Sequence, residues 1–158
     1  VVVNDLKTAL YDKHEDTPVF GFFDEFGVFA GEQVLNLVNQ GRGLGLYSGF
    51  GTQSLADLSR LAGQEFLEVF MGNMNTLAVM RVNDNKTTKY LADWVGKYDV
   101  QEYQAHINDS GKDTGLVKMA EKYFIKPEEM QRLNTGEAFM ISKVGGFEFD
   151  KIKVKYLS

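Results

Sequence analysis

The sequence predicts an α/β fold in which helices flank a parallel β-sheet. Along residues 1–97, short apolar runs bounded by proline, glycine or polar residues alternate with segments whose apolar residues recur at helical spacing. The clearest run covers residues 18–23, where a proline leads into an unbroken apolar stretch. Such a run is typical of a parallel strand buried on both faces, and a strand of this kind needs helices above and below it.

The elements predicted over residues 1–97 follow one another in alternation. Gly41 supplies a C-terminal stop for the second helix. Asp84 fits as the N-cap of the last helix, and we expect it also to pair with Arg81 inside the preceding strand. In order, we expect a helix over 3–13, a strand over 18–23, a helix over 31–40, a strand over 44–52, helical residues over 55–71, a strand over 76–82 and a helix over 85–95.

Residues 98–158 are more polar and predict an extension of this core. Pro127 followed by two glutamates is typical of a helix start, and two strands separated by a pair of glycines predict a C-terminal β-hairpin. We therefore expect a single domain over residues 1–158, with a core over 1–97 and an extension over 98–158. The extension is predicted to contain an exposed or edge strand over 100–106, a loop over 108–114, a short helix over 116–123, and the hairpin strands over 136–142 and 147–156.

The composition excludes several kinds of site. The 158-residue chain has no cysteine, hence no disulfide or thiolate metal site, and His14 and His106 lie far apart without a supporting cluster. A net charge of −5 argues against a broad basic surface for nucleic acid, although a few cations could line a channel built by several copies.

No apolar run approaches the ~20 residues of a membrane span, and there is no signal peptide pattern. We expect a soluble chain, cut from a larger protein because it begins with the apolar residues 1–3 and without a methionine.

Two carboxylates, Asp24 and Glu25, come directly after the first predicted strand. Open α/β sheets place their chemistry at the carboxyl ends of the strands. An apolar strand that ends in Asp-Glu has the pattern of a Walker B motif, in which Asp holds Mg²⁺, usually through water, and Glu polarises the water that attacks a γ-phosphate. A buried strand that reaches the surface and ends in acidic residues has the same pattern, so this motif alone leaves both interpretations open.

Two more polar residues lie beside predicted strand ends. Gln53 follows the second strand, where a Gln can hydrogen-bond the γ-phosphate or the attacking water, or can be an ordinary polar strand end with Ser54 as a helix N-cap. Arg42, between two glycines, can be an arginine finger for a neighbouring subunit or a cation favoured at a helix C-terminus. Neither G-x-x-x-x-G-K-[ST] nor G-x-G-x-x-G occurs in the chain, so it contains no phosphate-binding glycine loop.

Ordered blocks along nearly the whole chain resemble the TraG/TraD family of type IV secretion coupling proteins, which belong with the FtsK/HerA-like hexameric DNA-pumping ATPases. The resemblance implies part of a RecA-like (P-loop NTPase) domain with a C-terminal β-hairpin, in which the Walker A portion is absent. The blocks lie at residues 22–26, 37–45, 51–58, 72–76, 81–84 and 127–139.

The resemblance also implies roles for individual residues. Asp24 would serve Mg²⁺ through water, and Glu25 would activate the attacking water. Gln53 would contact the γ-phosphate of ATP, and Arg42 would be a finger that acts on a neighbouring subunit. The family's Walker A loop lies upstream of these motifs and is missing here. We therefore expect the full-length protein to hydrolyse ATP with Mg²⁺, and the isolated chain to bind ATP poorly and not to turn it over.

By the same resemblance, the full-length protein would deliver a relaxase–DNA complex to a type IV secretion channel in conjugation. It would be a homohexamer that drives single-stranded DNA through its ring channel, anchored at the cytoplasmic side of the cell membrane. Two alternatives stay open: an FtsK- or HerA-like DNA translocase outside conjugation, and a non-catalytic interaction module in which the pair Asp24 and Glu25 is structural.

Overall fold

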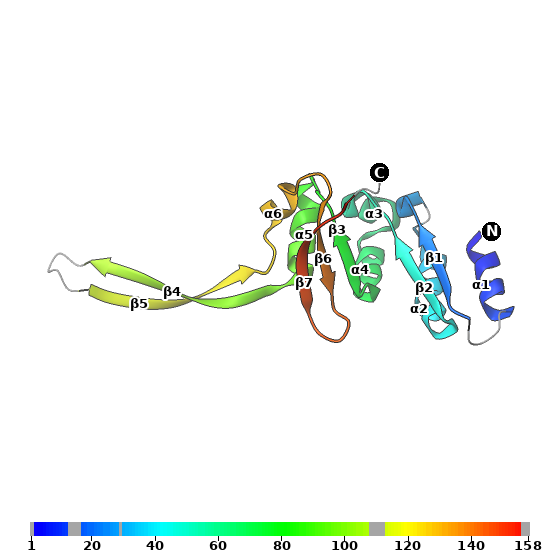
Figure 1. The fold of residues 1–158 in the computed structure, drawn as a ribbon, viewed down its shortest axis with the longest axis horizontal. Helices are drawn as coiled ribbons and strands as arrows, with labels where there is room; N and C mark the ends of the chain where they lie inside the picture. The colour runs from blue at the N-terminus through cyan, green and yellow to red at the C-terminus, as the bar shows by residue number, and fades with distance from the viewer. Residues whose placement is uncertain (1, 13–16, 29, 108–112, 156–158) are drawn as a thin grey trace. The chain divides into compact units, whose positions relative to one another are not determined.

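The computed structural model describes residues 2–12, 17–28, 30–107 and 113–155 of the chain. The fold is mixed α/β, as predicted, with a small parallel sheet and antiparallel strand pairing (Figure 1). The chain divides into two compact units. The N-terminal unit comprises residues 1–77 and 142–148, and the C-terminal unit comprises residues 78–141 and 149–158.

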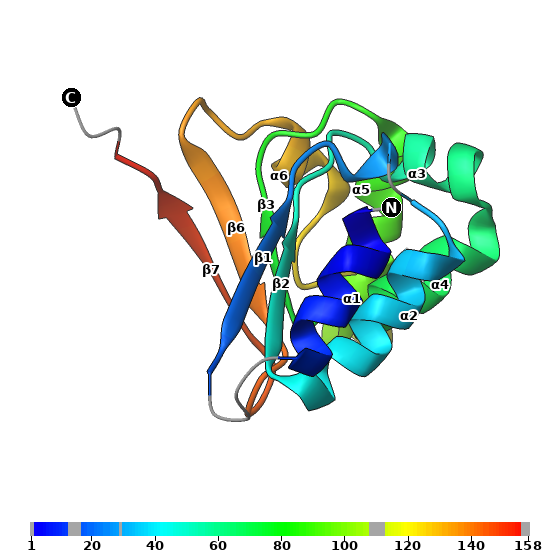
Figure 2. The same ribbon diagram turned by 90° about the vertical axis from the view of Figure 1, so that its right-hand side faces the viewer.

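The N-terminal unit is built on a parallel pair of strands, β1 and β2, in which Val19 pairs with Leu46 and Phe23 with Phe50. Figure 2 shows the first two helices side by side against this pair. Leu10, Leu37 and Leu46 form a buried cluster between them. The elements are α1 (Val2–Asp12), β1 (Val19–Phe23), η1 (Phe26–Val28), α2 (Glu32–Gly41), η2 (Arg42–Leu44), β2 (Leu46–Phe50), α3 (Leu55–Ala62) and α4 (Gln64–Asn73).

Phe26 is the centre of a second, aromatic core in this unit. The residue lies three positions after the end of β1, and its side chain is fully buried. Its ring centre lies 4.7 Å from those of Phe50 and Phe70, and 6.3 Å from that of Phe66. Because Phe66 and Phe70 come from α4 and Phe50 ends β2, this stack ties the strand ends to the helices.

The other face of the parallel pair is exposed in the described part of the chain. Phe20 and Phe22 are 78% and 75% exposed, and Tyr47 is 61% exposed. The rings of Phe20 and Tyr47 stack with their centres 5.2 Å apart. The expectation that β1 is buried on both faces is therefore wrong for the described residues, because their helices cover one face only. We call Phe20, Phe22 and Tyr47 the aromatic face.

The C-terminal unit holds a three-stranded sheet in the order β3-β6-β7. Leu91 of α5, Met130 of α6 and Ile141 of β6 are buried in its core. The predicted hairpin strands are neighbours in this sheet, joined by residues 143–147. Along the chain, the elements are β3 (Thr76–Val79), which starts at the boundary with the other unit, α5 (Asn85–Val95), β4 (Lys97–Ile107), β5 (Asp113–Tyr123), α6 (Pro127–Gln131), β6 (Glu137–Ser142) and β7 (Glu148–Lys153).

Strands β4 and β5 form a long antiparallel ribbon, which corrects two expectations (Figure 1). The helix expected over 116–123 is wrong, because these residues belong to β5. Asp113 and Thr114 of the expected loop over 108–114 are also in β5, and the rest of that loop lies outside the described residues. Cross-strand pairing from Lys97 opposite Tyr123 to Ile107 opposite Asp113 overrides the local helical spacing.

The strand expected over 76–82 is shorter than predicted, since β3 ends at Val79. Arg81 therefore lies beyond the strand and is exposed. None of the ion pairs between described residues joins Arg81 to Asp84. Asp84 instead caps α5, as predicted, by accepting hydrogen bonds from the backbone N–H groups of Lys86 and Thr87 at 3.1 and 3.0 Å. No helix in the described part of the chain combines the length and apolar character that a membrane span needs.

Candidate functional site

Asp24 and Glu25 lie at the carboxyl end of β1, and both are exposed. Asp24 Oδ1 accepts the backbone N–H of Glu25 at 2.9 Å. Glu25 has a φ of 48°, in the left-handed region, and among the described residues no other non-glycine residue has a positive φ. Such a conformation costs on the order of 1–3 kcal/mol and is most often found at functional sites. The acidic pair thus occupies a tight, strained turn at the end of the strand.

The end of β2 is hydrogen-bonded to this turn. The N–H of Gly51 donates to the carbonyl of Phe23 at 2.8 Å, and the N–H of Phe26 donates to the carbonyl of Gly51 at 2.7 Å. A Cβ atom at position 51 would lie 3.0 Å from Oδ1 of Asp24, so glycine permits the close approach. Residues 24–25 and 51–53 are therefore gathered at one edge of the sheet.

Gly51 is a residue of this site that sequence reasoning missed. Its local signal is a single glycine directly after β2 and before the polar residues 52–54. The contact with Asp24 depends on the pairing register of two strands, and no local pattern encodes that register.

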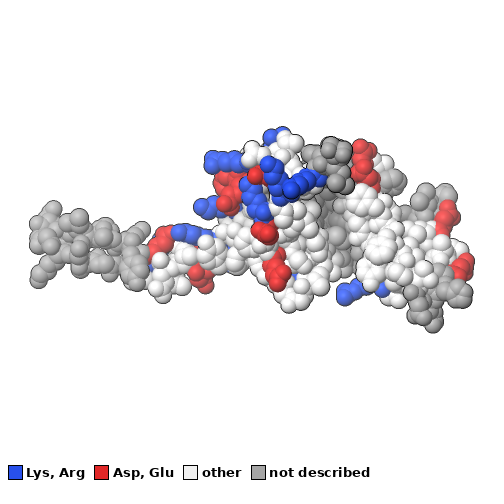
Figure 3. All heavy atoms as spheres, in the orientation of Figure 1, with Lys and Arg blue, Asp and Glu red and all other residues white. Residues whose placement is uncertain are grey.

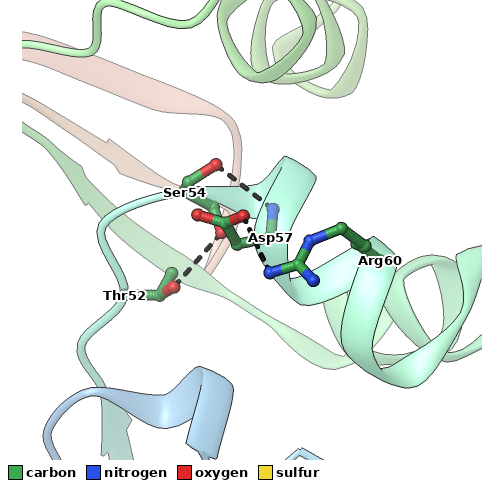
Figure 4. A network of polar contacts seen from close by, with 4 residues as sticks. All are labelled: Thr52, Ser54, Asp57 and Arg60. Atoms are coloured by element: carbon green, nitrogen blue, oxygen red, sulfur yellow. Dashed lines mark hydrogen bonds and ion pairs between the residues drawn. The ribbon is translucent and has the colours of Figure 1, made fainter.

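The loop that carries Gln53 is fixed to the start of α3 (Figure 4). Ser54 is the helix N-cap, as predicted, and its Oγ accepts the N–H of Asp57 at 3.3 Å. Thr52 Oγ1 donates to the carbonyl of Ser54 at 3.4 Å. Asp57 in turn contacts Arg60 at 3.5 Å, in an exposed pair that contributes little stability. Gln53 is thereby held between two anchored neighbours with its own side chain exposed.

Arg42 is not brought to this edge. It begins η2, before β2 starts, and is exposed. The carbonyl of Gly45 accepts the N–H of Val19, the first residue of β1, at 3.0 Å, so the segment with Arg42 lies where both strands begin. Five-residue strands of about 3.3 Å per residue separate that edge from Asp24. Arg42 and the acidic pair of the same chain are therefore at opposite ends of the sheet.

The groups at the Asp24 edge are oxygen ligands: two carboxylates, the Gln53 amide and the Thr52 hydroxyl. This donor set suits a hard cation such as Mg²⁺. Within the described residues, no group of three or more His, Cys, Asp or Glu side chains could hold a metal ion. Mg²⁺ is commonly held by one or two carboxylates together with substrate phosphates. Asp24 thus fits an ion that arrives with a nucleotide better than one bound by protein alone.

Comparisons with solved structures find the same fold in conjugative coupling proteins. The unbound monoclinic form of the bacterial conjugative coupling protein TrwBdeltaN70 matches with a TM-score of 0.80 and 18% identity, over 99% of this chain. Structures of the plasmid coupling protein TrwB with the ATP analogue ADPNP and with ADP and Mg²⁺ match with TM-scores of 0.77 and 0.74, each at 18% identity over 99% of this chain. In each case the chain spans 36% of the length of the matched structure.

The comparison of sequences gives the family. No curated protein sequence matches the chain. The family whose description reads "TraM recognition site of TraD and TraG" matches residues 18–135, which include the acidic pair, Gln53 and the ribbon. The family resemblance inferred from the ordered blocks is confirmed by this match, and the chain belongs to the family of the TraM recognition site of TraD and TraG.

Proposed function

We propose that this chain is the C-terminal part of the RecA-like motor domain of a conjugative coupling protein. The intact protein would hydrolyse ATP and drive single-stranded DNA, with its relaxase, toward a type IV secretion channel. The observation that carries the proposal is the gathering of Asp24, Glu25 and Gln53 at the carboxyl ends of two adjacent parallel strands. Matched structures of TrwB contain an ATP analogue, or ADP and Mg²⁺, which supports a nucleotide site in this fold.

Each residue would have a separate task in hydrolysis. Asp24 would orient the water shell of Mg²⁺, which offsets negative charge on the transferred phosphoryl group. Glu25 would accept a hydrogen bond from the attacking water and then its proton. Gln53 would hydrogen-bond the γ-phosphate. Because Ser54 is the N-cap of α3, this contact would couple the presence of the γ-phosphate to the position of that helix. Glycine at position 51 leaves the space in which the Asp24 carboxylate sits.

Arg42 would act on the site of a neighbouring copy. It lies at the opposite end of the sheet from Asp24, so a contact with the same nucleotide needs a second subunit. A heterologous contact of this kind forms a ring when its rotation closes, and the proposed homohexamer would be such a ring. An arginine that reaches a phosphate across such an interface offsets charge that develops during transfer.

The phosphate cradle would come from another part of a longer polypeptide. A parallel pair is normally covered on both faces, and a two-stranded sheet is marginal by itself. The exposed aromatic face and the 36% coverage of the matched structures both support a Walker A segment that completes this sheet. The longer protein would be anchored at the cytoplasmic side of the membrane. The family description further supports a TraM-like protein as a partner of residues 18–135.

The test is ATP hydrolysis by the protein extended to include a Walker A segment. With Glu25→Gln, turnover should fall at least about 100-fold while ATP binding is kept, because general-base catalysis contributes about 10²–10⁴-fold. Glu32→Gln, on an exposed glutamate of α2, is the matched control and should leave turnover unchanged. Equal turnover of the Glu25 variant and the wild type would refute the general-base role.

The alternative class of function is a docking module for a secretion partner, which the family description favours. In that case, Glu25→Gln would leave ATPase activity unchanged in the extended protein, and a TraM-like protein would bind the chain without nucleotide. A DNA translocase outside conjugation would show the ATPase effect but no binding of a relaxase.

A further inference from the structure

Three aromatic rings form a half-exposed row on the C-terminal unit. Tyr98 of β4 and Phe124, which follows β5, have ring centres 5.1 Å apart, and Phe149 of β7 continues the row at 6.0 Å from Phe124. These side chains are 42%, 36% and 42% exposed. The row thus joins the base of the ribbon to the outer strand of the three-stranded sheet.

Lysines flank both ends of this row. At the ribbon end, Lys122 lies directly opposite Tyr98, and Lys118 lies opposite Glu102 on the same ribbon face. Lys122 is paired with Glu102 at 2.9 Å, and this pairing raises the pKa of Lys122. Lys118 takes part in none of the ion pairs between described residues, so this end carries one excess positive charge.

The other end has the same arrangement. Phe149, Lys151 and Lys153 occupy every second position of β7, so the three side chains lie on one face of the strand. Lys151 is paired with Glu137 at 3.0 Å, whereas Lys153 is in none of the ion pairs between described residues. Figure 3 shows Lys and Arg side chains gathered where α6 and the end of β7 lie in Figure 1, with carboxylates among them.

The N-terminal and C-terminal units differ in net charge. The N-terminal unit has five Lys or Arg and eleven Asp or Glu, a net charge of −6. The C-terminal unit has twelve Lys or Arg and eleven Asp or Glu, a net charge of +1. The acidity of the whole chain, which argued against a nucleic-acid surface, therefore belongs to the unit that carries the acidic pair.

We propose that the row of Tyr98, Phe124 and Phe149, with Lys118 and Lys153 at its ends, is a binding site for single-stranded DNA. Exposed rings bind unpaired bases by stacking, and lysines on either side hold the phosphates. A row of this length accommodates about two or three bases. The proposal rests on the proposed function in taking DNA as the ligand, and it assigns the contact to the aromatic row between the ribbon and β7. Duplex DNA, whose bases are already stacked, does not fit.

The test measures binding of a fluorescent oligothymidylate of about 16 nucleotides to the full chain by anisotropy, without ATP. Tyr98→Ala and Phe149→Ala should each weaken binding about 5-fold or more, the effect of losing one base–ring stack. Tyr98→Phe keeps the ring and should bind as wild type, which separates stacking from a folding defect. Equal affinity of both alanine variants and the wild type, or no binding at all, would overturn the site.

The lysines are tested by the salt dependence of the same binding. Lys118→Gln with Lys153→Gln should reduce the slope of log affinity against log salt by about 1.4, since each phosphate contact to a single strand contributes about 0.7. Lys86→Gln with Lys89→Gln, on exposed lysines of α5, removes the same charge and should leave the slope unchanged. Equal slopes for the two double variants, or competition by duplex DNA as strong as by the single strand, would also refute the proposal.

The two proposals can fail separately. Oligonucleotide binding in this assay needs no nucleotide triphosphate, so Glu25→Gln should bind DNA as tightly as wild type. Loss of the DNA site with an intact Glu25 effect would remove only the further inference. Intact DNA binding with no Glu25 effect on ATPase would remove only the motor.

Discussion

The parallel pair β1–β2 and the ribbon β4–β5 are both two-stranded, yet they are stabilised in different ways. The parallel pair is apolar along its length and has its charged residues at the ends, with buried rings and helices against one face. The ribbon carries charges on both faces, with ion pairs Lys97–Glu121 and Lys122–Glu102. The pair depends on packing, and its polar chemistry is confined to the sheet edge. The ribbon depends on backbone pairing and leaves its side chains available for contacts.

The largest difference in stability between the two regions is expected when Phe26 is removed. Phe26→Ala should lower the free energy of unfolding by about 3–5 kcal/mol, because it leaves a cavity among the rings of Phe50, Phe66 and Phe70. Met119→Ala on the ribbon, where the side chain is 59% exposed, should change it by less than about 0.5 kcal/mol. Urea unfolding measures both, and a similar loss in the two variants would contradict the packing argument.

A smaller effect, of opposite sign, is expected at the strained end of the pair. Glu25→Gly should raise the free energy of unfolding by about 0.5–1 kcal/mol, because glycine adopts the φ of 48° without strain but loses more chain entropy on folding. Asp24→Gly, at a position without positive φ, is the control and should destabilise. The extended protein with Glu25→Gly should be more heat-stable and inactive as an ATPase. Destabilisation by Glu25→Gly would mean that the strain is not stored at this residue.

The sequence was sufficient wherever a pattern is local. Helical spacing and capping residues predicted α2, α5 and α6, and the proline and apolar run predicted β1 with the acidic pair after its end. The ribbon was missed because the spacing within residues 116–123 also fits a helix, and only pairing with β4 decides the conformation. Gly51 against Asp24 depends on strand register, and the placement of Arg42 at the opposite edge depends on strand direction. Each of these needs contacts between distant parts of the chain.

The smallest expected effect is a loss of amide protection at low pH, which should occur in the ribbon β4–β5 but not in the parallel pair β1–β2. The Lys122 ammonium holds the pKa of Glu102 below its usual 4.5, so this pair stabilises the ribbon above about pH 4.5 and is lost as pH falls through the lowered pKa. The residues of β1 and β2 include no carboxylate, so their pairing should not change over this range. Amide protection, corrected for intrinsic exchange, should therefore decrease at 97–102 and 118–123 but not at 19–23 and 46–50 between pH 7 and pH 3. Glu102→Gln should remove most of this pH dependence at the ribbon, because the titrating partner of Lys122 is gone. An equal loss of protection in both regions would show that the acid effect at the ribbon does not come from the Lys122–Glu102 ion pair.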